Sequence, residues 1–124
     1  MSSETKPFVP KHGMQKRLWM IRATDIPGSG ARDEEMLKRH LAHQDELERQ
    51  GILFGAGPVF DEQGNREYGM IIIRAESAED ARRIADTDPM FQEKRRNYTI
   101  HQWLLNEGRI NLAIDFSTGK CTLT

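Results

Sequence analysis

Two polar residues stand where apolar side chains are expected. His40 lies near the middle of the apolar stripe of an amphipathic segment, and Asp88 follows Ile84 at a spacing of four residues on the stripe of a second segment. A histidine held by a carboxylate is a general acid/base, because the carboxylate fixes the tautomer and stabilises the imidazolium. If both stripes cover the same face of one sheet, the spacing predicts a His40–Asp88 pair that transfers a proton.

Each of these residues also has an ordinary structural interpretation. A histidine on an apolar stripe is commonly a core residue that bonds to the backbone. An aspartate before a proline, as at Asp88–Pro89, can accept backbone N–H bonds at the end of a helix. Helical spacing by itself therefore leaves a structural and a chemical interpretation open.

The pair must be positioned by a small set of alternating elements. Apolar and large side chains at 16–24 favour a strand, which the turn-rich loop 26–33 follows. The next predicted element is a helix with Asp33 as N-cap and Gly51 beyond its end. The remaining elements are a strand at 52–60 closed by Gly57 and Pro58, a strand at 68–75, a helix from Ser77 to about Asp88, and a strand at 97–108.

This order of elements predicts the fold class. Strand, helix, strand, strand, helix, strand is the ferredoxin-like βαββαβ order of an α+β protein, with two helices on one face of an antiparallel sheet. Residues 110–116 are interpreted as an extra C-terminal strand. We expect a flexible arm over 1–14, the ferredoxin-like domain over 15–108 and an extension over 109–124.

The second face of such a sheet has no helices to cover it. Large side chains are available for that face, and the strand register decides which of them point there: Trp19, Ile21, Ile71, Ile73, His101 and Trp103. An apolar face left in water would be a large exposed patch. We therefore predict a homodimer formed through the sheets, or a higher homo-oligomer built from it.

Composition and charge exclude several classes of partner. The chain has 124 residues, with 18 basic and 19 acidic side chains and a formal charge of −1, so no basic surplus indicates nucleic acid or an anionic membrane. The basic run at 93–97 is interpreted as a solvated surface. No apolar run approaches a membrane span, and the first residues lack the apolar core of a signal peptide, so we expect a cytoplasmic protein. Cys121 is the only cysteine, which leaves no intrachain disulfide.

Three segments in order resemble the YciI-like, or YCII-related, proteins. They are "HLAHQDELERQGILFGAGPV", "YGMIIIRAESAEDARRIADTDPM" and "YTIHQW". The family has a histidine eleven residues before the glycine that opens G-x-L-x-x-A-G-P, matched by His40 and Gly51, and an A-D-x-D-P segment, matched by 85–89. The resemblance covers roughly residues 16–108.

The resemblance implies a fold, a site and a range of chemistry. It implies a dimeric ferredoxin-like α/β barrel of the muconolactone isomerase type, with His40 and Asp88 as the active-site pair. One family member is a dehydrochlorinase that acts on a chlorinated hydroxyhydroquinone. We expect proton transfer on a small organic acid or phenol, as in an isomerase or a lyase, without a cofactor.

Other residues are candidates for binding the substrate. Gly55, Gly57 and Pro58 in "FGAGPV" can let the backbone approach a ligand closely, although the two glycines are equally explained by a tight bend. Arg22 and Arg74 could bind a substrate carboxylate, but arginines at strand ends are more often surface ion pairs.

Three alternatives to this enzyme remain. The first is a binding module of the same fold without chemistry. The second is a metal site using His40, His43, Asp88 and His101, which has no recognised ligand spacing, so we predict no metal. The third is a cofactor-free monooxygenase on the related dimeric barrel, which requires an apolar pocket for an oxidisable aromatic compound.

Overall fold

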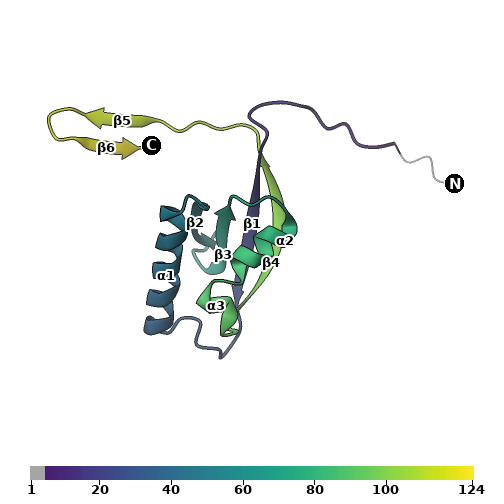
Figure 1. The fold of residues 1–124 in the computed structure, drawn as a ribbon, viewed down its shortest axis with the longest axis vertical. Helices are drawn as coiled ribbons and strands as arrows, with labels where there is room; N and C mark the ends of the chain where they lie inside the picture. Colours follow the sequence, from purple (N-terminus) through teal and green to yellow (C-terminus); the bar gives the residue numbers. More distant parts are fainter. Residues whose placement is uncertain (1–4) are drawn as a thin grey trace. The chain divides into compact units, whose positions relative to one another are not determined.

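The computed structural model describes residues 5–124, which divide into two compact units. The larger unit comprises residues 17–104. Its elements, shown in Figure 1, are β1 (Lys16–Asp25), α1 (Glu34–Arg49), β2 (Leu53–Phe60), β3 (Arg66–Ile73), α2 (Ala78–Ala85), α3 (Pro89–Gln92) and β4 (Arg96–Leu105). The predicted βαββαβ order is confirmed, with the short helix α3 added before the last strand.

The four strands form one sheet in the order β2-β3-β1-β4, which is the ferredoxin-like order. β3 pairs antiparallel with both β1 and β2. The prediction that Gly57 and Pro58 close the second strand is wrong, because they pair with Met70 and Gly69 and the strand continues to Phe60. β2 is an edge strand, where a proline can be accommodated without losing a ladder hydrogen bond.

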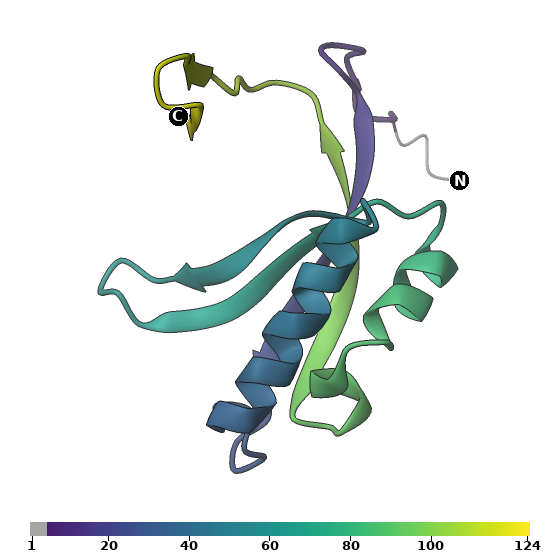
Figure 2. The ribbon, with the colours of Figure 1, turned by 60° about the vertical axis from the view of Figure 1, so that its left-hand side comes forward.

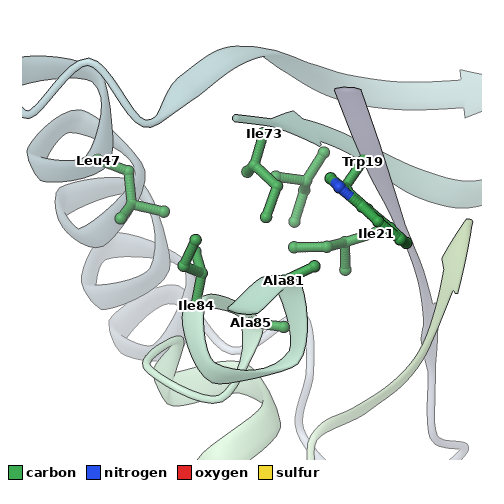
Figure 3. Packing of buried hydrophobic residues seen from close by; sticks show 8 residues of the cluster. Trp19, Ile21, Leu47, Ile73, Ala81, Ile84 and Ala85 are labelled. Carbon is green, nitrogen blue, oxygen red and sulfur yellow. The ribbon is translucent and has the colours of Figure 1, made fainter. Parts of the chain in front are cut away.

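The main core lies between the sheet and the helices. Figure 3 shows Trp19, Ile21 and Ile73 of the sheet directed toward Leu47 of α1 and toward Ala81, Ile84 and Ala85 of α2. Trp19 pairs with Ile73 and Ile21 pairs with Ile71, so the alternation of side chains places all four on the helical face. These four residues therefore do not point to the uncovered face of the sheet. Of the six side chains named for that face from the sequence, only His101 and Trp103 are left.

The apolar stripe of α1 explains why this segment packs as a helix. Its buried residues, Met36, His40, Gln44 and Leu47, recur at the spacing of one helical face. Gly51 has a φ of 75°, a left-handed conformation that suits glycine and ends the helix. Figure 2 shows α1 lying across the sheet, with the β2–β3 hairpin on one side and the α2–α3 segment on the other.

The corner between α2 and α3 determines where Asp88 lies. Ser77 caps α2 by accepting a hydrogen bond from Asp80 N at 3.0 Å, and the helix ends at Ala85. The four-residue spacing from Ile84 predicts that Asp88 continues the stripe of α2. This prediction is wrong, because the helix ends before Asp88. Instead it has an extended backbone, with ψ of 127°, and caps α3. The reason is Pro89, which disfavours helical geometry in the preceding residue and suits the first position of a helix.

A second, smaller core packs α3 against α1. Met90 of α3 is fully buried and packs with Met36 of α1 and with Ala31. Because Met36 lies one turn before His40, and Met90 lies two residues after Asp88, this apolar contact brings the two polar residues together.

The smaller unit combines residues 5–16 with residues 105–124. Its strands β5 (Leu112–Asp115) and β6 (Lys120–Leu123) form an antiparallel hairpin in a sheet of their own. The prediction of one extra strand is therefore corrected to two, joined by a turn in which Gly119 has a φ of 69°. Residues 1–4 of the predicted N-terminal arm lie outside the described residues. No helix within residues 5–124 is long and apolar enough to cross a membrane.

Candidate active site

The structure joins His40 to Asp88 by a buried hydrogen bond. His40 Nδ1 and Asp88 Oδ2 are 2.8 Å apart, and the two side chains are only 10% and 4% exposed. An ionised carboxylate can only accept, so Nδ1 carries the proton in this bond. The other carboxylate oxygen, Oδ1, accepts from Met90 N at 2.9 Å. Both oxygens of Asp88 are thus engaged, which fixes the orientation of the His40 ring.

His40 lines an open cleft of about 700 Å³ between α1 and the β2–β3 hairpin. Asp88 is not part of the cleft wall and lies behind the histidine. Because Nδ1 is occupied by Asp88, Nε2 is the nitrogen left to meet a molecule in the cleft. This is the arrangement that a general acid/base requires, with one nitrogen oriented by a carboxylate and the other available for proton transfer.

Gly55, Gly57 and Pro58 all line the same cleft from β2. Neither glycine has a positive φ, but β2 has a register shift between Leu53 and Gly55, a kind of irregularity that favours a glycine. A Cβ built on Gly55 or Gly57 would meet no atom within 4 Å, so packing does not require a glycine at either position. The bare backbone of β2 therefore leaves room on its side of the cleft.

Gln44 adds an unsatisfied polar atom beside His40. It lies one helical turn further along α1, lines the cleft and is 8% exposed. Its Oε1 is buried and has no hydrogen-bond partner within the described residues. A buried acceptor without a partner is unfavourable for the folded state.

The other histidines considered as metal ligands are engaged elsewhere. His43 Nε2 lies 2.9 Å from Thr87 Oγ1, and His101 Nε2 lies 2.8 Å from Thr99 Oγ1. Across residues 5–124, no group of three or more His, Cys, Asp or Glu side chains is placed to hold a metal ion.

The cleft is also lined by three arginines that the sequence did not indicate as site residues: Arg32, Arg66 and Arg96. The interpretation of 93–97 as a solvated surface is wrong for Arg96, whose side chain is 3% exposed and whose Nε donates to Asp25 Oδ1 at 2.8 Å. Arg66 Nη1 lies 3.6 Å from the same oxygen. Burial and repulsion from Arg96 and Arg32 lower the pKa of Arg66, and Asp25 only partly opposes this.

The arginines that the sequence suggested are used structurally. Arg22 lies over the ring of Tyr68 at 4.4 Å, and Arg74 donates to the backbone oxygens of Gly51 and Leu53. Neither lines the cleft. The predicted order of strands could have indicated one of the three cleft arginines, Arg66. Antiparallel neighbours put the end of one strand beside the start of another, so Arg66 at the start of β3 lies near Asp25 at the end of β1.

Comparison with known proteins identifies a family whose match has the same residue range as the larger compact unit. A model of the YCII-related domain family matches residues 17–104, the same range as the larger compact unit. Among solved structures, the chain is similar to 5-chloro-2-hydroxyhydroquinone dehydrochlorinase from Burkholderia phenoliruptrix, in complex with 2,5-dihydroxybenzoquinone. The TM-score is 0.55 and the identity 21%, over 69% of this chain and 92% of that one. No curated protein matches the chain.

Proposed function

Because the chain belongs to the YCII-related domain family, we propose that it is a small-molecule enzyme in which His40 is the general acid/base and Asp88 orients it. One observation carries the proposal, namely the 2.8 Å bond between His40 Nδ1 and Asp88 Oδ2 behind an open cleft. A histidine with a purely structural role would not need to line a cavity large enough for a small organic molecule.

The chemistry that this geometry supports is proton transfer. Nε2 of His40 removes a proton from an acidic C–H or O–H of the substrate, and the electron pair of that bond is delocalised into an adjacent unsaturated system. An isomerase returns the proton at another position, whereas a lyase expels a leaving group with the electron pair. The imidazolium that forms is stabilised by the Asp88 carboxylate, which remains ionised.

The proposed substrate is a small organic acid or phenol. The structural neighbour is a dehydrochlorinase solved with 2,5-dihydroxybenzoquinone, which supports a small oxygenated ring as the kind of molecule to test. Gly55, Gly57 and Pro58 are proposed to form the wall against which the ring lies.

The test compares two histidines on the same helix. The wild type, His40→Ala and His43→Ala are incubated with a panel of small aromatic and unsaturated acids and phenols, and products are identified by mass spectrometry. His43 is a matched control, because it also contacts the α2–α3 corner, through Thr87, but does not line the cleft. We expect His40→Ala to lower kcat/KM by about 10²–10⁴-fold and His43→Ala to leave it near the wild-type value.

Two results would contradict the proposal. Equal turnover by His40→Ala and wild type would exclude His40 as the acid/base. Ligands that bind to the wild type but are recovered without any change of mass would indicate a binding module of the same fold instead. Unfolding midpoints of all three proteins show that each is folded under the assay conditions.

A further inference from the structure

We propose that Arg32, Arg66 and Arg96 form a subsite that binds a carboxylate of the molecule on which His40 acts. This inference rests on the proposed function, because it takes His40 as the residue that acts on the bound molecule. The subsite itself is argued from the three arginines. All three line the cleft that His40 lines, and they come from three separate parts of the larger unit: the loop before α1, the start of β3 and the start of β4.

The cluster has more positive charge than its acidic neighbour can balance. Among residues 5–124, Asp25 is the one carboxylate in contact with it, through a single oxygen that lies 2.8 Å from Arg96 Nε and 3.6 Å from Arg66 Nη1. Arg32 has no ion-pair partner within residues 5–124. One carboxylate therefore contacts two of the three guanidinium groups, and the lowered pKa of Arg66 follows from its burial and from repulsion by Arg96 and Arg32.

The three arginines have different roles in this arrangement. Arg96 is the buried member, and its bond to Asp25 makes it a fixed part of the wall. Arg66 is 22% exposed and lies against Gly69, where a Cβ would come within 3.2 Å of its Nη2. Gly69 therefore lets the Arg66 guanidinium rest close to the backbone of β3. Arg32 is exposed and completes the cluster from the loop.

The charges are separated along the cleft. Its acidic lining residues, Asp45 and Glu48, belong to the C-terminal half of α1, whereas Arg32 comes just before the helix begins. His40 lies between these ends. An anionic group would be repelled by Asp45 and Glu48 and attracted by the arginines, so the cleft favours one orientation of a molecule with a carboxylate.

The spacing along α1 is compatible with a small acid. The helical rise from Glu34, at the start of α1, to His40 is about 9 Å, and an arginine side chain extends over part of that length. A carboxylate attached to a six-membered ring could therefore contact the cluster while the ring lies beside His40. Guanidinium groups bind carboxylates through paired hydrogen bonds, which would hold the ring in one position for proton transfer.

The test uses benzoate and benzamide, which share a shape but differ in charge. Their affinities for the full chain are measured by chemical-shift titration for the wild type, Arg66→Gln, Arg32→Gln and Arg82→Gln. Arg82 is an exposed arginine of α2 outside the cleft and serves as the matched control. Arg96 is left unchanged because its guanidinium is buried against Asp25, and removing this contact would destabilise the fold.

We expect the wild type to bind benzoate at least about tenfold more tightly than benzamide. Arg66→Gln and Arg32→Gln should each remove most of that difference, whereas Arg82→Gln should keep it. Equal affinity of the wild type for the two probes, no binding of benzoate at millimolar concentration, or unchanged benzoate affinity in both cleft variants would overturn the subsite.

The same titration with His40→Ala separates this inference from the proposed function. Benzoate binding should survive in His40→Ala, because the anion contacts the arginines and not the imidazole. If turnover does not depend on His40 but benzoate affinity depends on Arg66 and Arg32, the acid/base assignment fails and the subsite stands. If turnover depends on His40 but benzoate affinity is the same in wild type, Arg66→Gln and Arg32→Gln, the subsite is wrong and the acid/base assignment stands.

Discussion

At the scale of single residues, Asp88 has two contacts that act together. One carboxylate oxygen caps α3 through Met90 N, and the other accepts from His40 Nδ1. The cap expected of an aspartate before proline and the hydrogen bond to a histidine are therefore both made by one side chain. Because the cap fixes the carboxylate, the imidazole is held in one orientation without any further partner.

This double contact predicts different effects for two substitutions. Asp88→Asn keeps an oxygen that can cap α3, so we expect stability to change by less than about 1 kcal/mol. It removes the charge that stabilises the His40 imidazolium, and kcat/KM should fall by about 10²-fold or more. Asp88→Ala should lose both, with a further destabilisation of about 1–2 kcal/mol from the missing cap.

Urea denaturation and steady-state kinetics on the same preparations measure the two effects. If Asp88→Asn keeps its activity and Asp88→Ala loses activity only because it unfolds, activity follows stability in both variants. Asp88 would then be a helix cap without a role in proton transfer.

At the scale of elements, the α2–α3 corner is held to its neighbours by a few specific contacts. Met90 packs on α1, and Thr87 bonds to His43. On the other side, Tyr98 of β4 donates to Asp86 Oδ1 at 2.7 Å and packs against Phe91 with ring centroids 4.7 Å apart. The buried packing of Met90 on α1 and the contact of Phe91 with β4 therefore hold Asp88 near His40, whereas the Thr87–His43 bond lies at an exposed position.

Tyr98→Phe tests the contact with β4 and its dependence on pH. Burial and the hydrogen bond to Asp86 raise the pKa of Tyr98 to about 12, from an ordinary value of 10.0. A raised pKa means that the folded state favours the neutral phenol, so its contribution to stability is full below about pH 10 and is lost as the pH rises toward about 12.

We expect Tyr98→Phe to lose less than about 1 kcal/mol near neutral pH, because the contact is largely solvated. The deficit relative to wild type should narrow between about pH 10 and about pH 12. Urea midpoints at about pH 8 and about pH 11 check this. A deficit that grows over this range would show that the pKa of Tyr98 is not raised in the folded protein.

At the scale of the whole molecule, one face of the sheet carries aromatic side chains without a covering helix. Tyr98 and Ile100 pack toward the helices, so alternation along β4 places Trp103 on the opposite face. Trp103 is 39% exposed and contacts Phe54, also partly exposed, edge to face at a centroid distance of 6.3 Å. This patch supports the proposal of a homodimer formed through the sheets.

Light scattering with size-exclusion chromatography tests the dimer. We expect the wild type to have twice the chain mass of 14.3 kDa, and Trp103→Glu to shift toward the monomer because a charge would be buried at the interface. Ala42→Glu, a substitution at an exposed position of α1, should leave the mass unchanged. A monomeric wild type would exclude the dimer at the concentrations tested.

Sequence patterns determined the elements and their order because these depend on local spacing. The apolar stripe of α1, the glycine at its end and the Ser77 cap are properties of neighbouring residues, and they placed each element within a few positions. His40 and Asp88 were recognisable for the same reason, since a polar residue on an apolar stripe and an Asp-Pro pair are visible in the chain itself.

Only the tertiary structure decided which residues meet. The register of β1 and β3 turned Trp19 and Ile21 toward the helices, and the packing of Met90 on Met36 brought Asp88 to His40 from an unexpected helix. Arg32, Arg66 and Arg96 line one cleft although they are far apart in sequence, and two of them, Arg66 and Arg96, contact the same aspartate. Such contacts depend on how strands pair and helices pack, and no local pattern encodes a distance between segments so far apart in the chain.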